Sequence, residues 1–383
     1  MVNKTKLSAI AALVGGTIGV GIFGLPLVFV KAGWLLALIY LVVLTAITLA
    51  LNLAYGEIVL RTKRAHHLIG YATVYLGQWA RWLMLFTITL GFYSALLAYI
   101  IVGGDFLSNI SGLWATAWSP ELASFIFFVV GALIVAGGIK VLARVDLIMA
   151  TFYLIAIGVL AFWSAPHMQL VNFTTNVWHW HYWFLPYGTI LFAITGLSGV
   201  VVQHEILEGK DHFFKKAIIW GSLIPPVLYL IFSLVLLGVV GDRITPEAID
   251  SLLPWLGNKA IILGSIFGLL AVFTSFINLS TVMQEVFMFD FKVPRFVAWL
   301  LALMPPYLFF LWQVRDYIKV IGFSGGVAFS IELIILILVY HKVKKQGHRM
   351  PEYSLHLPVL LWYLIGLVAL SGLIYTLFNY GVV

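Results

Sequence analysis

Long runs of apolar residues recur along the whole chain, and they constrain its fold more than any other feature. A helix needs about 20 such residues to cross the hydrocarbon of a membrane. Of the 383 residues, 62% are hydrophobic and only 10% are charged, whereas a soluble globular chain carries about 25% charged residues. The sequence therefore predicts an all-α polytopic membrane protein.

Charged residues and Pro/Gly clusters divide the apolar runs into eleven candidate transmembrane helices. We place these spans at about residues 7–30, 33–60, 80–107, 121–143, 146–166, 184–206, 216–240, 259–289, 294–313, 318–340 and 356–379. The first run follows a basic segment but is too long for the core of a cleaved signal peptide, so we interpret it as a retained span.

Lys and Arg are distributed unevenly between the loops on the two sides of the membrane. With a cytoplasmic N-terminus, 17 fall on the inner side and 5 on the outer side, which accounts for all 22. This bias follows the positive-inside rule and predicts a multi-pass protein of the cell membrane with its N-terminus inside and its C-terminus outside. The same asymmetry explains the net charge of +7, so we expect no nucleic-acid partner.

The residue types of an enzyme site are not grouped in this sequence. The chain has no cysteine, which excludes disulfides, thiolate nucleophiles and cysteine-ligated metals. No Ser-His-Asp set, metal cluster or carboxylate pair falls at a shared depth of the predicted spans. We therefore expect a non-enzymatic membrane protein without a bound cofactor.

The first span is dense in glycine, at Gly15, Gly16, Gly19, Gly21 and Gly24. Three of these have the G-x-G-x-x-G spacing of a dinucleotide-binding turn, but that turn needs an acidic residue about 20 positions later, and the next acid is Glu57. Close helix packing would explain only the G-x-x-x-G pair. Each glycine costs a helix interior about 1 kcal/mol relative to Ala, so the run predicts a broken helix. Such a break is tolerated at membrane depth where its backbone lines a cavity.

A second break is predicted in the sixth span, where residues 195–199 (TGLSG) interrupt an apolar helix. Transporters of the inverted-repeat type place discontinuous helices at corresponding positions and bind substrate at the freed backbone near the midplane. The spans then form one transporter domain over residues 1–383, with repeats at about 7–166 and 184–340 and a peripheral helix at about 356–379.

Four segments carry a resemblance to a known superfamily: GGTIGVGIFGLP, AYGEIVLRTK, FAITGLSGVVVQHEILEG and AVFTSFINLSTVMQEVFMFDFKVPR. They resemble the amino acid-polyamine-organocation transporters. In length and layout the chain is similar to bacterial aromatic and hydroxy amino acid permeases and to sodium-coupled neutral amino acid transporters. The resemblance implies a leucine-transporter-like fold with discontinuous helices 1 and 6, and cation-coupled symport of a small neutral amino acid, aromatic ones included, by alternating access.

The resemblance also implies a substrate site made of backbone groups. The N–H groups of Val20, Gly21 and Ile22 would hold the substrate carboxylate, as the start of a half-helix attracts anions. Further positions at the two breaks would receive the ammonium group or line the site: Thr17, Ala193, Ile194, Thr195 and Ser198. On span 3, Tyr93 and Tyr99 can reach the pocket or serve in core packing.

A sodium site is carried over from the sodium-coupled branch of the superfamily. Its five matching positions are Gly15, Ile18 and Ala271, through their carbonyls, and Thr274 and Ser275, through their hydroxyls. The alternative is that both hydroxyls bond back to carbonyls one turn earlier, as is common in membrane helices. A further sodium site of the leucine-type symporters is not expected, because Ile22 stands where they have asparagine.

The coupling ion has two candidates. Span 5 lacks the lysine that replaces sodium in some proton-coupled relatives, which favours sodium. The bacterial aromatic permeases are regarded as proton-driven, and Glu332 inside span 10 is a candidate proton site because ionisable groups are costly in lipid. Glu332 has alternatives as a partner of Asn52 or Asn278 or as a packing residue. A non-transporting amino acid sensor of the same fold is a further alternative. We expect a monomer whose partners are the amino acid and membrane lipid.

Overall fold

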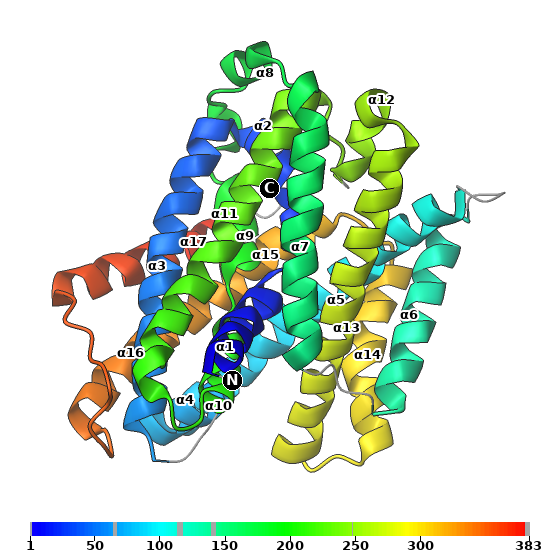
Figure 1. Ribbon diagram of the computed structural model, residues 1–383. Coiled ribbons are helices and arrows are strands. Elements are labelled where there is room, and N and C mark those ends of the chain that lie inside the picture. Colours follow the sequence, from blue (N-terminus) through cyan, green and yellow to red (C-terminus); the bar gives the residue numbers. More distant parts are fainter. Residues whose placement is uncertain (1, 64–66, 113–117, 139–142, 247, 380–383) are drawn as a thin grey trace.

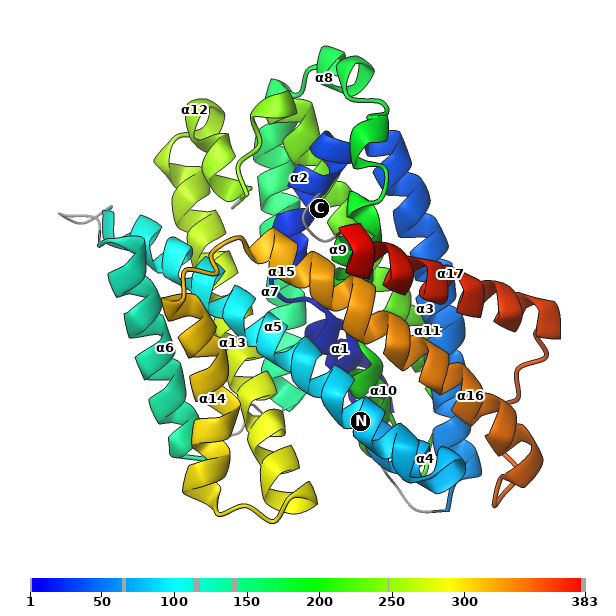
Figure 2. The same cartoon turned by 180° about the vertical axis from the view of Figure 1, so that it is seen from behind.

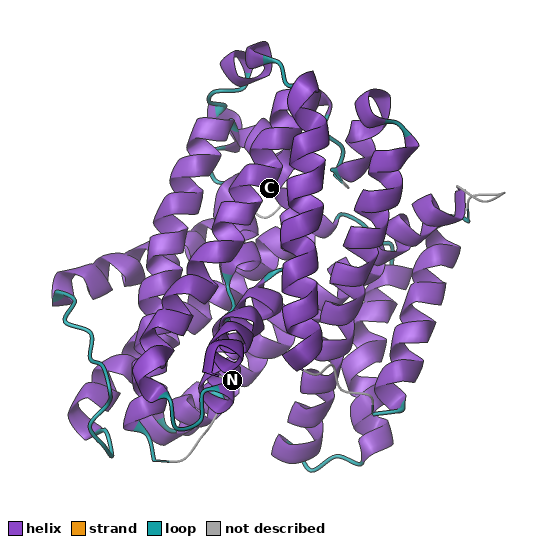
Figure 3. Ribbon diagram, in the orientation of Figure 1, coloured by secondary structure: helices purple, strands orange, loops and turns teal. Residues whose placement is uncertain are grey.

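The computed structural model describes residues 2–63, 67–112, 118–138, 143–246 and 248–379. Within these ranges every regular element is helical (Figures 1 and 3). The uninterrupted long helices are α3 (Trp34–Arg61), α5 (Gln78–Gly112), α7 (Ala143–Ser164), α11 (Phe214–Val240), α13 (Asn258–Asp290) and α17 (Val359–Asn379). The prediction of an all-α protein is confirmed for this part of the chain.

Three further spans are interrupted. The first consists of α1 (Val2–Thr17) and α2 (Gly21–Ala32), the second of α9 (Leu185–Ile194) and α10 (Leu197–Ile206). The third consists of α15 (Tyr317–Ser324), a π-helical turn η6 (Gly325–Phe329) and α16 (Ser330–Gln346).

The remaining helices are short. Two are apolar helices of 17 residues, α6 (Pro120–Ala136) and α14 (Arg295–Leu311). The others are α4 (Leu68–Leu76), α8 (Leu170–Thr175) and α12 (Leu253–Leu256). Single 3-10 turns lie at η1 (Ala165–His167), η2 (Trp180–Tyr182), η3 (Asp211–Phe213), η4 (Gly241–Arg243) and η5 (Ile249–Leu252).

The number of membrane spans follows from length and composition. In the described residues, eight helical segments are long and apolar enough to cross a membrane, and the bent pair α1–α2 makes nine. The predicted total of eleven also counts α6 and α14, which are shorter. The multi-pass character is therefore confirmed, while the exact count and the five-plus-five repeat stay predictions.

Local sequence explains where several of these helices begin. Ser119 precedes α6, and its hydroxyl accepts a hydrogen bond from the Leu122 N–H, while Pro120 occupies the first helical position. Asp316 precedes α15 and accepts from the Lys319 N–H at 3.1 Å. Such caps satisfy the N–H groups that the first turn of a helix leaves without partners.

The interrupted spans α1–α2 and α9–α10 lie in the centre of the molecule (Figures 1 and 2). α1 packs against α7, α10 and α11, and α2 against α9 and α11. α9 crosses the α15–η6 segment at glycines: a Cβ on Gly188 would overlap the Gly322 backbone, and a Cβ on Gly325 would overlap the Gly188 backbone. α17 lies on the outside, where it contacts α16 and η6 (Figure 2).

The segment that links α16 to α17, residues 347–358, folds back onto the end of α3; we call it the strap. The fully buried Glu57 carboxylate of α3 binds it, accepting hydrogen bonds from Ser354 Oγ at 2.9 Å and the Leu355 N–H at 2.8 Å. Arg61 at 2.8 Å and Lys344 at 3.3 Å balance the charge. The strap ends where α17 begins, so the last span starts at Val359 rather than at about residue 356 as predicted.

Candidate functional site

The first span is broken between Thr17 and Gly21, as predicted from its glycine density. α1 and α2 meet at a bend of 58°. Two glycines are required there by close approach: a Cβ on Gly19 would lie 2.7 Å from the Tyr99 hydroxyl, and a Cβ on Gly21 would lie 2.6 Å from the Ala193 Cβ. The break thus brings the backbone of span 1 against side chains of α5 and α9.

The break in the sixth span is shorter than predicted. α9 ends at Ile194 and α10 begins at Leu197, so only Thr195 and Gly196 lie outside helices. The prediction extended the break to Gly199, which is wrong, because the Gly199 N–H already donates to the Gly196 carbonyl at 3.0 Å. Gly199 instead allows α10 to pack on α1, since a Cβ there would lie 2.9 Å from the Leu13 side chain.

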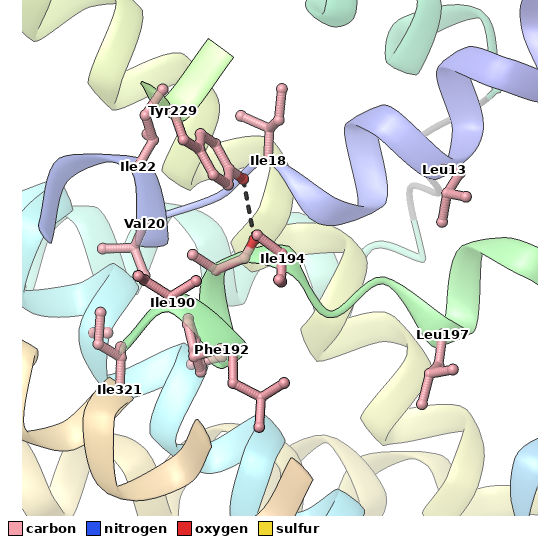
Figure 4. Close-up of a cluster of buried hydrophobic side chains, with 14 of the residues drawn as sticks. Leu13, Ile18, Val20, Ile22, Ile190, Phe192, Ile194, Leu197, Tyr229 and Ile321 are labelled. Atoms are coloured by element: carbon pink, nitrogen blue, oxygen red, sulfur yellow. Dashed lines mark hydrogen bonds between the residues drawn. The ribbon is translucent and has the colours of Figure 1, made fainter. Parts of the chain in front are cut away.

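Tyr229 on α11 connects the two breaks. Its hydroxyl lies 3.1 Å from the carbonyl oxygens of both Thr17 and Ala193, to which it donates. Figure 4 shows its side chain between the two interrupted spans, among buried aliphatic residues. Tyr229 is not predicted from the sequence, because a tyrosine in the apolar run PPVLYLIF gives no local signal.

A cavity of about 390 Å³ adjoins both breaks. From the interrupted spans it is lined by Gly16, Thr17, Gly19, Gly21, Ala193, Thr195, Leu197 and Ser198. Its apolar wall includes Ile88, Gly91, Phe92, Ala95, Phe192 and Phe329, and its polar groups include Tyr55, Tyr99, Glu285 and Glu332. A largely apolar cavity with a few convergent polar groups is typical of a small-molecule site.

The cavity extends toward one end of the molecule and is blocked toward the other. It reaches the exposed His67 beside α4 and Glu285 near the end of α13. Beyond the break on the other side, the buried Phe23 of α2 packs against Phe106 and Phe267, with ring centroids 4.9 and 5.5 Å apart. The cavity is therefore reached from the end that carries α4.

The residues expected at the substrate site fall into two groups. Thr17, Gly21, Ala193, Thr195 and Ser198 line the cavity. The side chains of Val20, Ile22 and Ile194 are buried in the surrounding core (Figure 4).

The two tyrosines of α5 differ in position. Tyr99 lines the cavity. Tyr93 is not among the lining residues, because its hydroxyl donates to the Leu301 carbonyl of α14 at 2.6 Å. The expectation that Tyr93 contributes to the pocket is therefore not met, and Tyr99 takes that place.

The hydroxyls of the expected sodium site have protein partners. Thr274 Oγ1 donates to the carbonyls of Leu270 at 2.8 Å and Ala271 at 3.1 Å, which is the alternative stated for it. Ser275 is hydrogen-bonded to Tyr99, whose hydroxyl lies beside Gly19. Tyr99 thus stands between the first break and α13.

Of the two carbonyl positions of span 1, Gly15 lies in the last turn of α1 and Ile18 directly follows its end. The helical hydrogen bonding extends past Thr17, because the Ile18 N–H donates to the Val14 carbonyl at 2.9 Å. Ile18 is buried, and Gly15 is half-buried.

Glu332 lies on the cavity wall and is 4% exposed. Asn52, one of the partners considered for it, instead donates to Ser222 Oγ at 3.0 Å, and both residues are buried.

Comparisons with known proteins agree with this architecture. The model of the tryptophan/tyrosine permease family matches residues 3–370. The tyrosine-specific transport system 2 of Haemophilus influenzae is 28% identical in a match that covers 91% of this chain and 90% of the relative. The crystal structure of MhsT in complex with L-phenylalanine has a TM-score of 0.72 over 98% of both chains at 16% identity. That match shows a shared fold, the leucine-transporter-like one that the sequence resemblance implies.

Proposed function

Because the chain belongs to the tryptophan/tyrosine permease family, we propose that it carries an aromatic amino acid across the membrane by secondary active transport. The family is one of multi-pass membrane transporters of amino acids and not of enzymes. The observation that carries the proposal is the meeting of two interrupted helices at one cavity. Broken helices whose freed backbone groups face a shared cavity are the usual binding site of inverted-repeat transporters.

The substrate carboxylate would bind at the start of α2. The first N–H groups of a helix have no intrahelical partner, and the helix dipole makes this end attractive to anions. Gly21, the first residue of α2, lines the cavity. The N–H groups of Val20, Gly21 and Ile22 are the proposed donors.

The substrate ammonium would bind at the carbonyl ends of α1 and α9. Thr17 is the last residue of α1, and Ala193 is the last but one of α9. Their two carbonyls share the single proton of the Tyr229 hydroxyl, and each carbonyl oxygen has two lone pairs. Acceptor capacity therefore remains for an ammonium group, which is also favoured at the negative end of a helix dipole.

The walls of the cavity suit an aromatic side chain. Phe192 and Phe329 lie with ring centroids 5.7 Å apart, and Ile88, Phe92 and Ala95 complete an apolar surface. Aromatic rings gain about 0.5 to 1.5 kcal/mol from such pairing beyond the area that they bury.

The orientation proposed from the distribution of Lys and Arg places the N-terminus and α4 on the cytoplasmic side. A cavity that reaches His67 while Phe23 is enclosed by aromatic rings then corresponds to an inward-facing state of the alternating-access cycle. We further propose eleven spans with a five-plus-five inverted repeat and a monomeric protein.

Sodium is the proposed coupling ion, bound by the carbonyls of Gly15, Ile18 and Ala271 and the hydroxyls of Thr274 and Ser275. In this inward-facing arrangement the two hydroxyls are bonded to protein groups, so sodium binding would require them to turn toward the ion. Proton coupling is the second candidate, favoured by the position of the buried Glu332 on the cavity wall.

Uptake by the purified full-length protein in liposomes tests these proposals. Labelled tyrosine, tryptophan and phenylalanine are offered with an inward sodium gradient, with an inward proton gradient, and with neither. We expect accumulation of an aromatic amino acid driven by sodium. If accumulation follows the pH gradient and does not depend on sodium, the coupling ion is the proton. Binding without any gradient-driven uptake would instead identify an amino acid sensor.

A further inference from the structure

Glu332 occupies an unusual position for an acidic residue. It is the sixteenth residue of the 30-residue span Tyr317–Gln346, and therefore lies near mid-depth. It is 4% exposed, and it lines the same cavity as the two helix breaks. An ionisable side chain at this depth is costly and is retained where it has a function.

The Glu332 carboxyl has no hydrogen-bond or ion-pair partner among the residues that the structure describes. Asn52, one of the partners considered for it, is instead paired with Ser222 Oγ at 3.0 Å. Leaving a buried polar group unpaired costs about 1 to 3 kcal/mol, and more if it is charged. The missing partner of Glu332 is therefore expected to come from a molecule in the cavity.

An apolar passage leads from the second break to Glu332. Phe192 directly precedes Ala193, and its ring lies beside that of Phe329. Phe329 precedes Glu332 by three residues, a rise of about 4.5 Å along an ideal α-helix. Gly91 also lines the cavity here, and its Cβ position lies 3.7 Å from the Phe329 ring.

The chemistry of this arrangement specifies the ligand group. An amino acid held at the breaks by its carboxylate and ammonium would direct its side chain along the apolar passage. The far end of that side chain would then lie near the unpaired Glu332 carboxyl. Tyrosine carries an O–H donor and tryptophan an N–H donor on the ring, whereas phenylalanine has neither.

We propose that the Glu332 carboxyl accepts a hydrogen bond from the ring O–H or N–H of the substrate and thereby selects tyrosine and tryptophan over phenylalanine. This inference rests on the proposed transport of aromatic amino acids. A site built to bond a polar group of its ligand discriminates strongly against the analogue that lacks it, because the buried partner is then left unpaired.

Equilibrium binding to the detergent-solubilised full-length protein provides the test. The probes are tyrosine, tryptophan, phenylalanine and 4-fluorophenylalanine, which resembles tyrosine in size but has no ring donor. We expect wild-type protein to bind tyrosine and tryptophan about 10- to 100-fold more tightly than the two others, which is what leaving a buried polar group without its partner costs. Equal affinity for tyrosine and 4-fluorophenylalanine would overturn the proposal without any substitution.

Two variants link the preference to this residue. Glu332→Leu should bind tyrosine no more tightly than phenylalanine, while Glu332→Gln, which keeps an acceptor oxygen, should retain part of the preference. The surface variant Glu352→Gln is the control and should behave as wild type. A preference for tyrosine and tryptophan that is unchanged in both Glu332 variants would overturn the proposal. If these variants keep the preference but lose gradient-driven uptake, Glu332 is a proton site instead. If wild-type protein binds none of the four probes, the proposed function itself is wrong.

Discussion

The hydroxyl of Tyr229 lies 3.1 Å from the carbonyl oxygen of Ala193 and donates a hydrogen bond to it. The same hydroxyl reaches the Thr17 carbonyl at the end of α1. Two half-helices from opposite halves of the sequence thus direct the negative ends of their dipoles at one donor. A donor in this position stabilises the two helix ends against each other.

Tyr229→Phe should therefore impair transport. It removes the shared donor and leaves two carbonyls underpaired, at a cost of about 1 to 3 kcal/mol. We expect uptake of labelled aromatic amino acid to fall by about tenfold, the equivalent of 1.4 kcal/mol. Tyr93→Phe is the matched control, because its hydroxyl bonds to the Leu301 carbonyl outside the cavity. Equal uptake by both variants would show that the bridge is dispensable.

Gly21→Ala should disrupt the contact between the two interrupted spans. The added methyl group would lie 2.6 Å from the Ala193 Cβ and 2.7 Å from its Cα, and overpacking of this kind costs about 1 to 3 kcal/mol. We expect weaker binding of the amino acid, because α2 and α9 must separate. Gly158→Ala on α7 is the control, since no atom lies within 4 Å of its Cβ position. Equal affinities in both variants would contradict this account of Gly21.

The first break could be predicted from the sequence because its cause is local. Each of the five glycines between Gly15 and Gly24 disfavours a continuous helix wherever the segment lies. The second break was placed too far along the chain, because Gly199 has a different cause: it makes room for Leu13 of α1. A glycine required by a neighbouring helix and a glycine required by a break look alike in a sequence.

Partners that are distant in the chain could not be predicted at all. Tyr229 acts on residues 212 and 36 positions away, and Glu57 binds residues almost 300 positions away. Both lie in segments whose local pattern is that of an ordinary apolar helix. Tyr93 and Tyr99 show the same limit, because only the packing of α5 against α13 and α14 decides which of them faces the cavity.

Thr274→Val should show whether the Thr274 hydroxyl is a sodium ligand or only bonds to a carbonyl of its own helix. The hydroxyl bonds back to the Leu270 carbonyl at 2.8 Å, and Thr281 on the same helix bonds in the same way to Ile277 at 2.8 Å. Both substitutions thus remove a bond to the carbonyl one turn earlier in α13, and Thr274→Val also removes a longer one to Ala271. If sodium is bound as proposed, only Thr274→Val should raise the sodium concentration needed for half-maximal uptake, by about tenfold, the equivalent of 1.4 kcal/mol. Identical sodium dependence in the two variants would remove Thr274 from the site.

Glu57→Ala should release the strap from α3. The carboxylate is fully buried, receives hydrogen bonds from Ser354 and Leu355, and pairs with Arg61 and Lys344. Removing one partner of a buried ion pair is expected to cost about 3 to 5 kcal/mol. The apparent unfolding temperature in detergent should therefore fall clearly below that of wild type.

Release of the strap has a second consequence that does not depend on the unfolding temperature. The strap contains Arg349, a site for trypsin, whose backbone N–H donates to the Arg61 carbonyl at 3.2 Å. Because a protease needs a locally detached segment, trypsin should cut Glu57→Ala protein here faster than wild type. Glu352→Ala is the matched control, since it removes only a partly exposed carboxylate 3.5 Å from Arg349. If both variants are cut at the wild-type rate, Glu57 does not hold the strap in place.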